Sequence, residues 1–147
     1  MRKVRRISSG QKYRSFVGTD FSYADLGSRN IDKYAYSIAG TDTVRDKFCY
    51  VLESRAREGA DTQYRRIVSK VDTVSWIPLE ADLYVESDQP TKHLISENLE
   101  QVSGFWIARK LTMSNLQKKT KTVLRFQEVR INTGLEVNTF TQRNLKR

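Results

Sequence analysis

Alternation between apolar and polar residues dominates the chain and predicts β-strands. The clearest case is residues 79–86, which alternate strictly, as a half-buried strand does. One face of this stretch carries Leu79, Ala81, Leu83 and Val85, and the other carries Glu80, Asp82 and Glu86. Similar or less regular patterns predict further strands at 3–7, 34–38, 48–52, 64–72, 92–99, 105–113 and 123–131. The pattern therefore predicts about seven or eight strands.

The segments between these strands are short and rich in turn-forming residues. They are Gly40–Asp42, Glu86–Pro90, Ser103-Gly104 and Asn115–Lys119. Connections of this length cannot hold crossover helices, so neighbouring strands should be antiparallel and follow one another as a meander.

Two short helical segments are expected beside the strands. Ser22-Tyr23-Ala24-Asp25 has the form of a capping box, and Gly27 suits the end of a helix of one or two turns. A second short helix is expected near 139–145. No repeat or linker divides the sequence, so we expect one mainly β domain over residues 1–147.

Aromatic residues are spread through the predicted strands. The chain has two tryptophans, seven tyrosines and six phenylalanines, and aromatics on strand faces usually form the core. The predicted helices are too short to cover a whole apolar face. A strongly curved, unclosed sheet could wrap this face around a short helix or around a bound apolar ligand. This reasoning leads to a lipid-binding hypothesis.

Charge is the most extreme feature of the composition. The chain has 26 basic and 17 acidic residues and a formal net charge of +9, which brings nucleic acid and anionic surfaces into question. Both ends of the chain are basic, while its middle is mildly acidic. At the ends, however, basic residues alternate with apolar ones, as in Lys110-Leu111 and Arg125-Phe126. This pattern is typical of the solvated face of a strand, so nucleic-acid binding is the weakest of our hypotheses.

Candidates for catalysis and metal binding are few. Cys49 is the only cysteine and His93 the only histidine. A single cysteine cannot form an internal disulfide, and one cysteine with one histidine cannot build a zinc site. Both lie within predicted strands, where Cys49 is expected to be a small buried apolar residue and His93 an ordinary strand residue. Asp20 and Asp25 could act as an acid–base pair, but capping groups are the simpler interpretation. The common nucleotide-binding glycine motifs are absent. We therefore expect no catalytic residues, no metal and no cofactor.

Several segments of the sequence resemble one known family. In order along the chain, they are Phe16–Leu26 (Phe-Val-Gly-Thr-Asp-Phe-Ser-Tyr-Ala-Asp-Leu), Cys49–Ser54, Trp76–Leu79, Asn132–Leu135 and Phe140–Arg143. They are similar to segments of the LolA-like outer-membrane lipoprotein-sorting protein family.

The resemblance implies a half β-barrel whose concave apolar side receives acyl chains, and a non-catalytic carrier of the bacterial envelope, located in the periplasm. Expected partners are lipids or lipoprotein acyl chains and an inner-membrane transporter or exporter. The candidate groove residues are Phe16, Phe21, Tyr23 and Leu26 at the mouth, with Trp76 and Trp106 nearby. The alternative is a structural or interaction module that acts with a membrane exporter.

The resemblance covers only the C-terminal part of the family's domain. Family members have a signal peptide, a helix and several strands before the segment that matches residues 1–7, and these elements are expected to be missing here. Met1–Arg6 is basic, but no apolar run of a signal peptide follows it. A sheet edge near residues 3–7 would then be exposed, through which two copies could pair as a homodimer.

Overall fold

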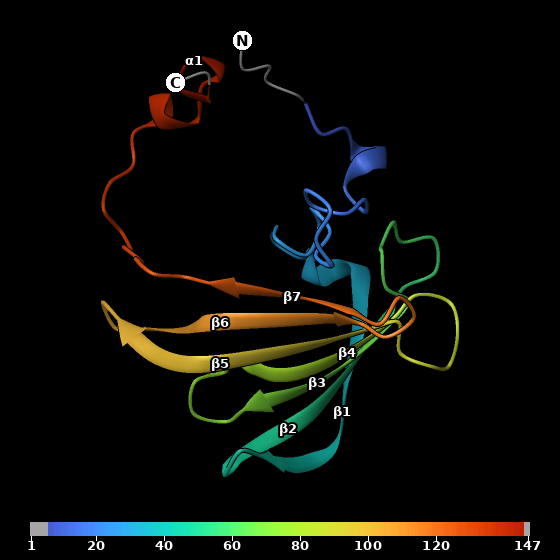
Figure 1. Ribbon diagram of the computed structural model, residues 1–147. Coiled ribbons are helices and arrows are strands. Elements are labelled where there is room, and N and C mark those ends of the chain that lie inside the picture. Colours follow the sequence, from blue (N-terminus) through green and yellow to red (C-terminus); the bar gives the residue numbers. More distant parts are fainter. Residues whose placement is uncertain (1–5, 146–147) are drawn as a thin grey trace.

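The computed structural model describes residues 6–145 and consists mainly of one antiparallel sheet (Figure 1). Its seven strands pair in sequence order. They are β1 (Tyr34–Val44), β2 (Lys47–Ala56), β3 (Arg66–Asp72), β4 (Pro78–Tyr84), β5 (Lys92–Val102), β6 (Phe105–Asn115) and β7 (Thr120–Arg125). The sheet is strongly twisted and stays open, because β1 and β7 lie at its two edges and do not pair with each other. The expected curved antiparallel meander is confirmed.

Helical structure is confined to short pieces at the two ends of the chain. Three 3-10 turns are present among the described residues: η1 (Ser9–Gln11), η2 (Ile31–Lys33) and η3 (Val137–Phe140). The helix expected near 139–145 is confirmed as α1 (Gln142–Leu145). No helix among residues 6–145 has the length and apolar character needed to cross a membrane.

The antiparallel meander gives the sheet two different ends. One end, which we call the closed end, holds the connections 57–65, 85–91 and 116–119 together with the start of β1. The other, the open end, holds the turns 45–46, 73–77 and 103–104. The N-terminal residues lie against the closed end, as their contacts with β5 and β7 show.

The main core lies on one face of the sheet at the closed end. Its buried members are Phe21, Tyr34, Tyr64, Ile67, Ala81, Leu83 and Met113. Directly paired residues share a face, and the pairs Ile67–Leu83 and Leu94–Met113 continue this face across the strands. Ala81 and Leu83 of β4 are buried on either side of the half-buried Asp82, which confirms the expected alternation over this part of residues 79–86. Leu79 is buried as well, but the register between β3 and β4 shifts beside it, and it packs with a different cluster. We call the face that holds the main core the apolar face.

A second, smaller cluster lies on the opposite face. It contains Val44, Cys49 and Leu79, with Leu99 packed against them. Cys49 is five residues from Ser54, which pairs with Ile67 of the main core, so the alternation of β2 turns its side chain to the other face. The expectation that Cys49 is a small buried residue is confirmed, and burial raises the pKa of its thiol.

The expected helix at Ser22–Gly27 is wrong, because this stretch forms turns. The capping-box bonds do form: Ser22 N donates to the Asp25 carboxylate, and Asp25 N donates to Ser22 Oγ. However, Tyr23 N donates to the carbonyl of Arg14, and Ala24 N to that of Lys12. These backbone amides pair with an earlier segment, so no helical ladder follows the cap.

Two other local predictions are wrong. Gly40 lies inside β1, where a bulge follows Ile38, and the chain reverses instead at Arg45-Asp46, both with positive φ (46° and 62°). The last strand ends at Arg125 and does not continue to residue 131. Of the strand expected at 3–7, residues 3–5 lie outside the described residues, and the following two are not in a strand.

Candidate functional site

Toward the open end of the sheet, the described residues 6–145 leave the apolar face exposed. Five large side chains lie on this face between the start of β1 and the open end, and we call them the apolar strip: Tyr36, Ile38, Phe48, Tyr50 and Trp76. Their exposed fractions range from 36% for Tyr50 to 66% for Ile38 and Trp76. Tyr36 pairs with Ser54 and Ile38 with Leu52, and Ser54 pairs with Ile67 of the main core. The strip is therefore a continuation of the core face that the described part of the chain leaves exposed.

Aromatic contacts hold part of the strip together. The rings of Phe48 and Tyr50 meet edge to face, with centroids 6.3 Å apart. The Trp76 ring stacks on Tyr50 at 6.4 Å, with only 21° between the ring planes. Exposed patches of this kind on a monomer typically mark binding sites.

A buried carboxylate fixes the turn that presents Trp76. Asp72 accepts hydrogen bonds from Ser75 Oγ (2.5 Å) and Ser75 N (3.0 Å). Burial alone would raise the pKa of Asp72, but the bonds from Ser75 and Val74 together lower it. Trp76 has a φ of 59°, a backbone conformation that costs energy for a bulky residue and persists only where its surroundings enforce it. The turn thus holds an exposed tryptophan in a fixed position.

At the closed end, the same face is covered by residues 12–27, which we call the cover segment. Phe21 is its central apolar contact and is only 2% exposed. The carboxylate of Asp20 accepts hydrogen bonds from the hydroxyls of Thr120 and Thr122 on β7. Asp20 N donates to Thr122 Oγ1, and Lys92 of β5 donates to the Asp20 carbonyl at 2.7 Å. Hydrogen bonds therefore attach the cover segment to the sheet around the buried side chain of Phe21.

A second buried carboxylate extends the anchor toward β3. Asp25, whose side chain is 4% exposed, forms an ion pair with Lys92 at 3.4 Å. It also accepts a hydrogen bond from the hydroxyl of Tyr64 at 2.9 Å. Burial raises the pKa of Tyr64 strongly, and the negative charge of Asp25 raises it further. Asp20 and Asp25 thus serve as anchors of the cover segment.

The six candidate groove residues fall into separate places. Phe21 is part of the core, while Phe16 and Tyr23 pack edge to face at 5.4 Å within the cover segment, and Leu26 is exposed nearby. Trp76 lies at the open end, so the structure does not bring it beside these four residues.

Trp106 lies on the face opposite the apolar strip. Met113 of β6 belongs to the core face, and Trp106 is seven residues before it, so the alternation of β6 turns the two side chains to opposite faces. Trp106 lines a depression beside Arg45, Lys47 and Leu99. The two tryptophans therefore report on different surfaces of one sheet.

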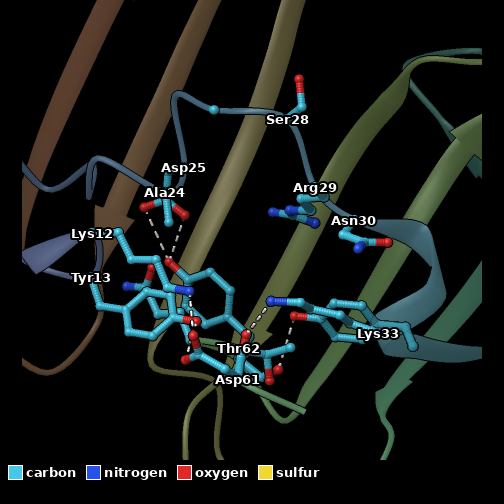
Figure 2. A pocket seen from close by; sticks show the side chains of 14 residues that line it. Lys12, Tyr13, Ala24, Asp25, Ser28, Arg29, Asn30, Lys33, Asp61 and Thr62 are labelled. Carbon is cyan, nitrogen blue, oxygen red and sulfur yellow. Dashed lines mark hydrogen bonds and ion pairs between the residues drawn. The ribbon is translucent and has the colours of Figure 1, made fainter. Parts of the chain in front are cut away.

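A pocket of about 200 Å³ opens beside the cover segment at the closed end (Figure 2). Three cationic side chains line it, from Lys12, Arg29 and Lys33. Lys12 forms an ion pair with Asp61, which also accepts a hydrogen bond from Tyr13 at 2.8 Å. The neighbouring Lys12 lowers the pKa of Asp61.

Sequence reasoning did not identify this pocket. Its charged residues come from the N-terminal residues, from the approach to β1 and from the β2–β3 connection. No spacing motif joins Lys12, Arg29 and Asp61, which only the fold brings together.

The histidine and the acidic residues were the other candidates for catalysis or metal binding. His93 lies in β5, as expected of an ordinary strand residue, and its Nδ1 is 2.7 Å from the Asp82 carboxylate. Within residues 6–145, no cluster of three or more histidine, cysteine, aspartate or glutamate side chains has the arrangement of a metal site.

Comparisons with known proteins place the chain in a group of similar folds. A family model described as that of an uncharacterized protein matches residues 1–147. No curated protein matches the sequence significantly. Among solved structures, an outer membrane lipoprotein-sorting protein domain from Vibrio parahaemolyticus matches with 32% identity and a TM-score of 0.88, over 99% of this chain and 62% of that one.

Two further structures are similar. A DUF1329 family protein from Desulfovibrio piger shares 30% identity with a TM-score of 0.89, over 96% of this chain and 59% of that one. A LolA superfamily protein from Nitrosomonas europaea, at 19% identity and a TM-score of 0.70, shares the fold over 90% of this chain and 60% of that one. The chain thus spans 59% to 62% of the length of these three proteins.

Proposed function

The chain belongs to the LolA-like outer-membrane lipoprotein-sorting protein family, and from this premise we propose that it is a non-catalytic carrier that holds acyl chains on the apolar strip. Its place of action is the periplasm of the bacterial envelope. Its partners are lipids or lipoprotein acyl chains and an inner-membrane transporter or exporter that exchanges them.

The observation that carries this proposal is the uncovered half of the apolar face. The strip offers a row of aromatic and aliphatic side chains on the face that the core occupies, with the buried Ser54 and Ser69 between the two. Each CH₂ group that an acyl chain buries there contributes about 0.8 kcal/mol. Partial burial of one chain is therefore enough for useful, reversible binding.

The two tryptophans provide a direct test. Trp106→Phe leaves Trp76 as the only tryptophan, on the strip, and Trp76→Phe leaves Trp106 on the opposite face. Each variant is titrated with dodecyl maltoside below its micelle concentration. We expect a blue shift of the Trp76 emission and no shift of the Trp106 emission. No shift in either variant would overturn the carrier proposal, as would equal shifts in both.

A pair of strand variants separates the two faces. Ile38→Glu places a charge on the strip, whereas Val123→Glu places one on the opposite face of β7, where Val123 pairs with Thr112. We expect Ile38→Glu to lose detergent binding at least tenfold and Val123→Glu to keep it, because burying a charge against a hydrocarbon chain is costly. Native mass spectrometry after exposure to phospholipid provides the second readout.

The alternative hypothesis is an interaction module that uses the strip as a protein contact beside a membrane exporter. It predicts no lipid uptake by the wild type and a stoichiometric protein complex in envelope extracts. It also predicts that Ile38→Glu breaks this complex while Val123→Glu preserves it.

A further inference from the structure

Two cations of the pocket shown in Figure 2 are not neutralised by a carboxylate. Lys12 is paired with Asp61, and Lys92 is paired with Asp25. Lys33 donates only to the backbone carbonyl of Asp61, at 2.9 Å. Among residues 6–145, neither Arg29 nor Lys33 forms an ion pair with an acidic side chain, and Figure 2 shows the ends of both pointing into the pocket. The pocket therefore has an excess of positive charge.

The pocket also touches the apolar face. Tyr34 and Tyr64 line it and at the same time belong to the main core. The ring of Tyr34 lies 6.3 Å from the ring of Tyr36, the first residue of the apolar strip. From Tyr34 to Ile38, β1 advances by about 13 Å at the usual rise per strand residue. A molecule with a charged head and an extended chain could follow this path without leaving the surface.

We infer that the cargo is an anionic amphiphile, whose phosphate or carboxylate head binds between Arg29 and Lys33 while its chain lies along Tyr36 and Ile38. The inference rests on the proposed carrier function and adds the class of ligand. The guanidinium of Arg29 matches the geometry of a phosphate or carboxylate with two parallel hydrogen bonds, and Lys33 adds a second positive charge. The hydroxyl of Tyr13 and the side chain of Asn30 line the same pocket.

A matched pair of amphiphiles tests this assignment. Dodecyl phosphate and dodecyl maltoside have the same chain, and only the first has an anionic head. Their dissociation constants are measured by calorimetry below their micelle concentrations, with inorganic phosphate as a third probe. We expect the wild type to bind dodecyl phosphate about tenfold more tightly than dodecyl maltoside, because hydrogen bonds between charged groups are the stronger ones.

Two double variants test which side chains cause the preference for dodecyl phosphate. Arg29→Gln with Lys33→Gln should remove the preference for dodecyl phosphate and leave the affinity for dodecyl maltoside unchanged. Lys118→Gln with Lys119→Gln removes the same charge from the exposed β6–β7 turn, and should keep the preference. If both double variants lose the preference for dodecyl phosphate equally, net charge alone attracts the anion, and the assignment of the head group to Arg29 and Lys33 is overturned.

The remaining outcomes separate this inference from the proposed function. If the wild type binds both amphiphiles equally, the inference of an anionic head group is overturned, while the carrier proposal stands. Binding of neither overturns the carrier proposal itself. If inorganic phosphate competes only weakly with dodecyl phosphate, the result supports a lipid head group in the pocket. If inorganic phosphate binds as tightly as dodecyl phosphate, the pocket is a site for a free anion, and the assignment of an amphiphile is overturned.

Discussion

The two halves of the apolar face are made from the same strands but have opposite surroundings. At the closed end, the cover segment contributes Phe21 to the buried cluster that also contains Leu83 and Tyr64. At the open end, Ile38 and Trp76 stand on the same face with two thirds of their surface exposed. Alternation in the strands is similar in both halves. Apolar alternation thus defines a face, while a separate segment decides whether that face becomes core or stays exposed.

The largest contrast should appear when apolar side chains are shortened in each half. Leu83→Ala should lower the free energy of unfolding by roughly 4 kcal/mol, because it leaves a cavity in a fully buried site. Ile38→Ala should change it by less than about 0.5 kcal/mol, because the side chain is already in water. Chemical denaturation measures both. Similar losses in the two variants would show that the strip is structural.

Shortening the residue at the centre of the cover segment should make the closed end resemble the open end. Phe21→Ala should cost roughly 3 kcal/mol of stability, since large-to-small changes of buried aromatics create cavities. It should also increase the binding of an apolar dye to the folded protein, because the cover no longer seals the core. Trp76→Ala, which removes an exposed aromatic, is the matched control and should decrease dye binding. Unchanged dye binding in Phe21→Ala would contradict the sealing role.

Weakening the ion pair that attaches the cover segment to the sheet should have a smaller effect on stability. Asp25→Asn leaves the largely buried Lys92 side chain without its carboxylate partner and should cost about 2 kcal/mol. Asp88→Asn, in the exposed β4–β5 connection, should be neutral in the same thermal unfolding experiment. A neutral Asp25→Asn would mean that apolar contacts alone fasten the cover.

The smallest effect should be a change in pH dependence. Burial and Asp25 raise the pKa of Tyr64 above that of an unfolded tyrosine, which is about 10. The stabilising contribution of the protonated phenol is therefore complete below pH 10 and is lost as the pH rises beyond it. Relative to Tyr64→Phe, the wild type should lose about 1 kcal/mol more stability between pH 9 and pH 11. Parallel stability curves for the two proteins would rule out this role for Tyr64.

Much of the sheet could be predicted because its strands follow simple alternation. The reversal at Arg45-Asp46 could not, since both residues adopt positive φ without the glycine or asparagine that usually marks such a turn. Gly40 misled the prediction because its conformational freedom serves a bulge within β1 and not a turn.

The exposed apolar strip and the pocket were harder to predict than the strands. The aromatic pattern indicated an apolar face, but not that Phe21 would be sealed inside it while Trp76 would remain exposed. The pocket residues Lys12, Arg29 and Asp61 converge from distant positions. Neither alternation nor local spacing contains this information, because it depends on how the N-terminal residues cross the sheet.

The bonds of Asp20 to β7 have a consequence for the order in which the protein assembles. Each strand pairs with its neighbour in sequence, so the sheet closes only short loops as it folds. The bond from Asp20 to Thr122, by contrast, joins residues 102 positions apart, and closing such a loop carries a larger entropic cost. We therefore expect the cover segment to dock after the sheet has formed, and to detach before the sheet unfolds. Each detachment would extend the exposed apolar surface from the strip into the closed end, so the apolar area in contact with water would be set by an equilibrium as well as by the fold.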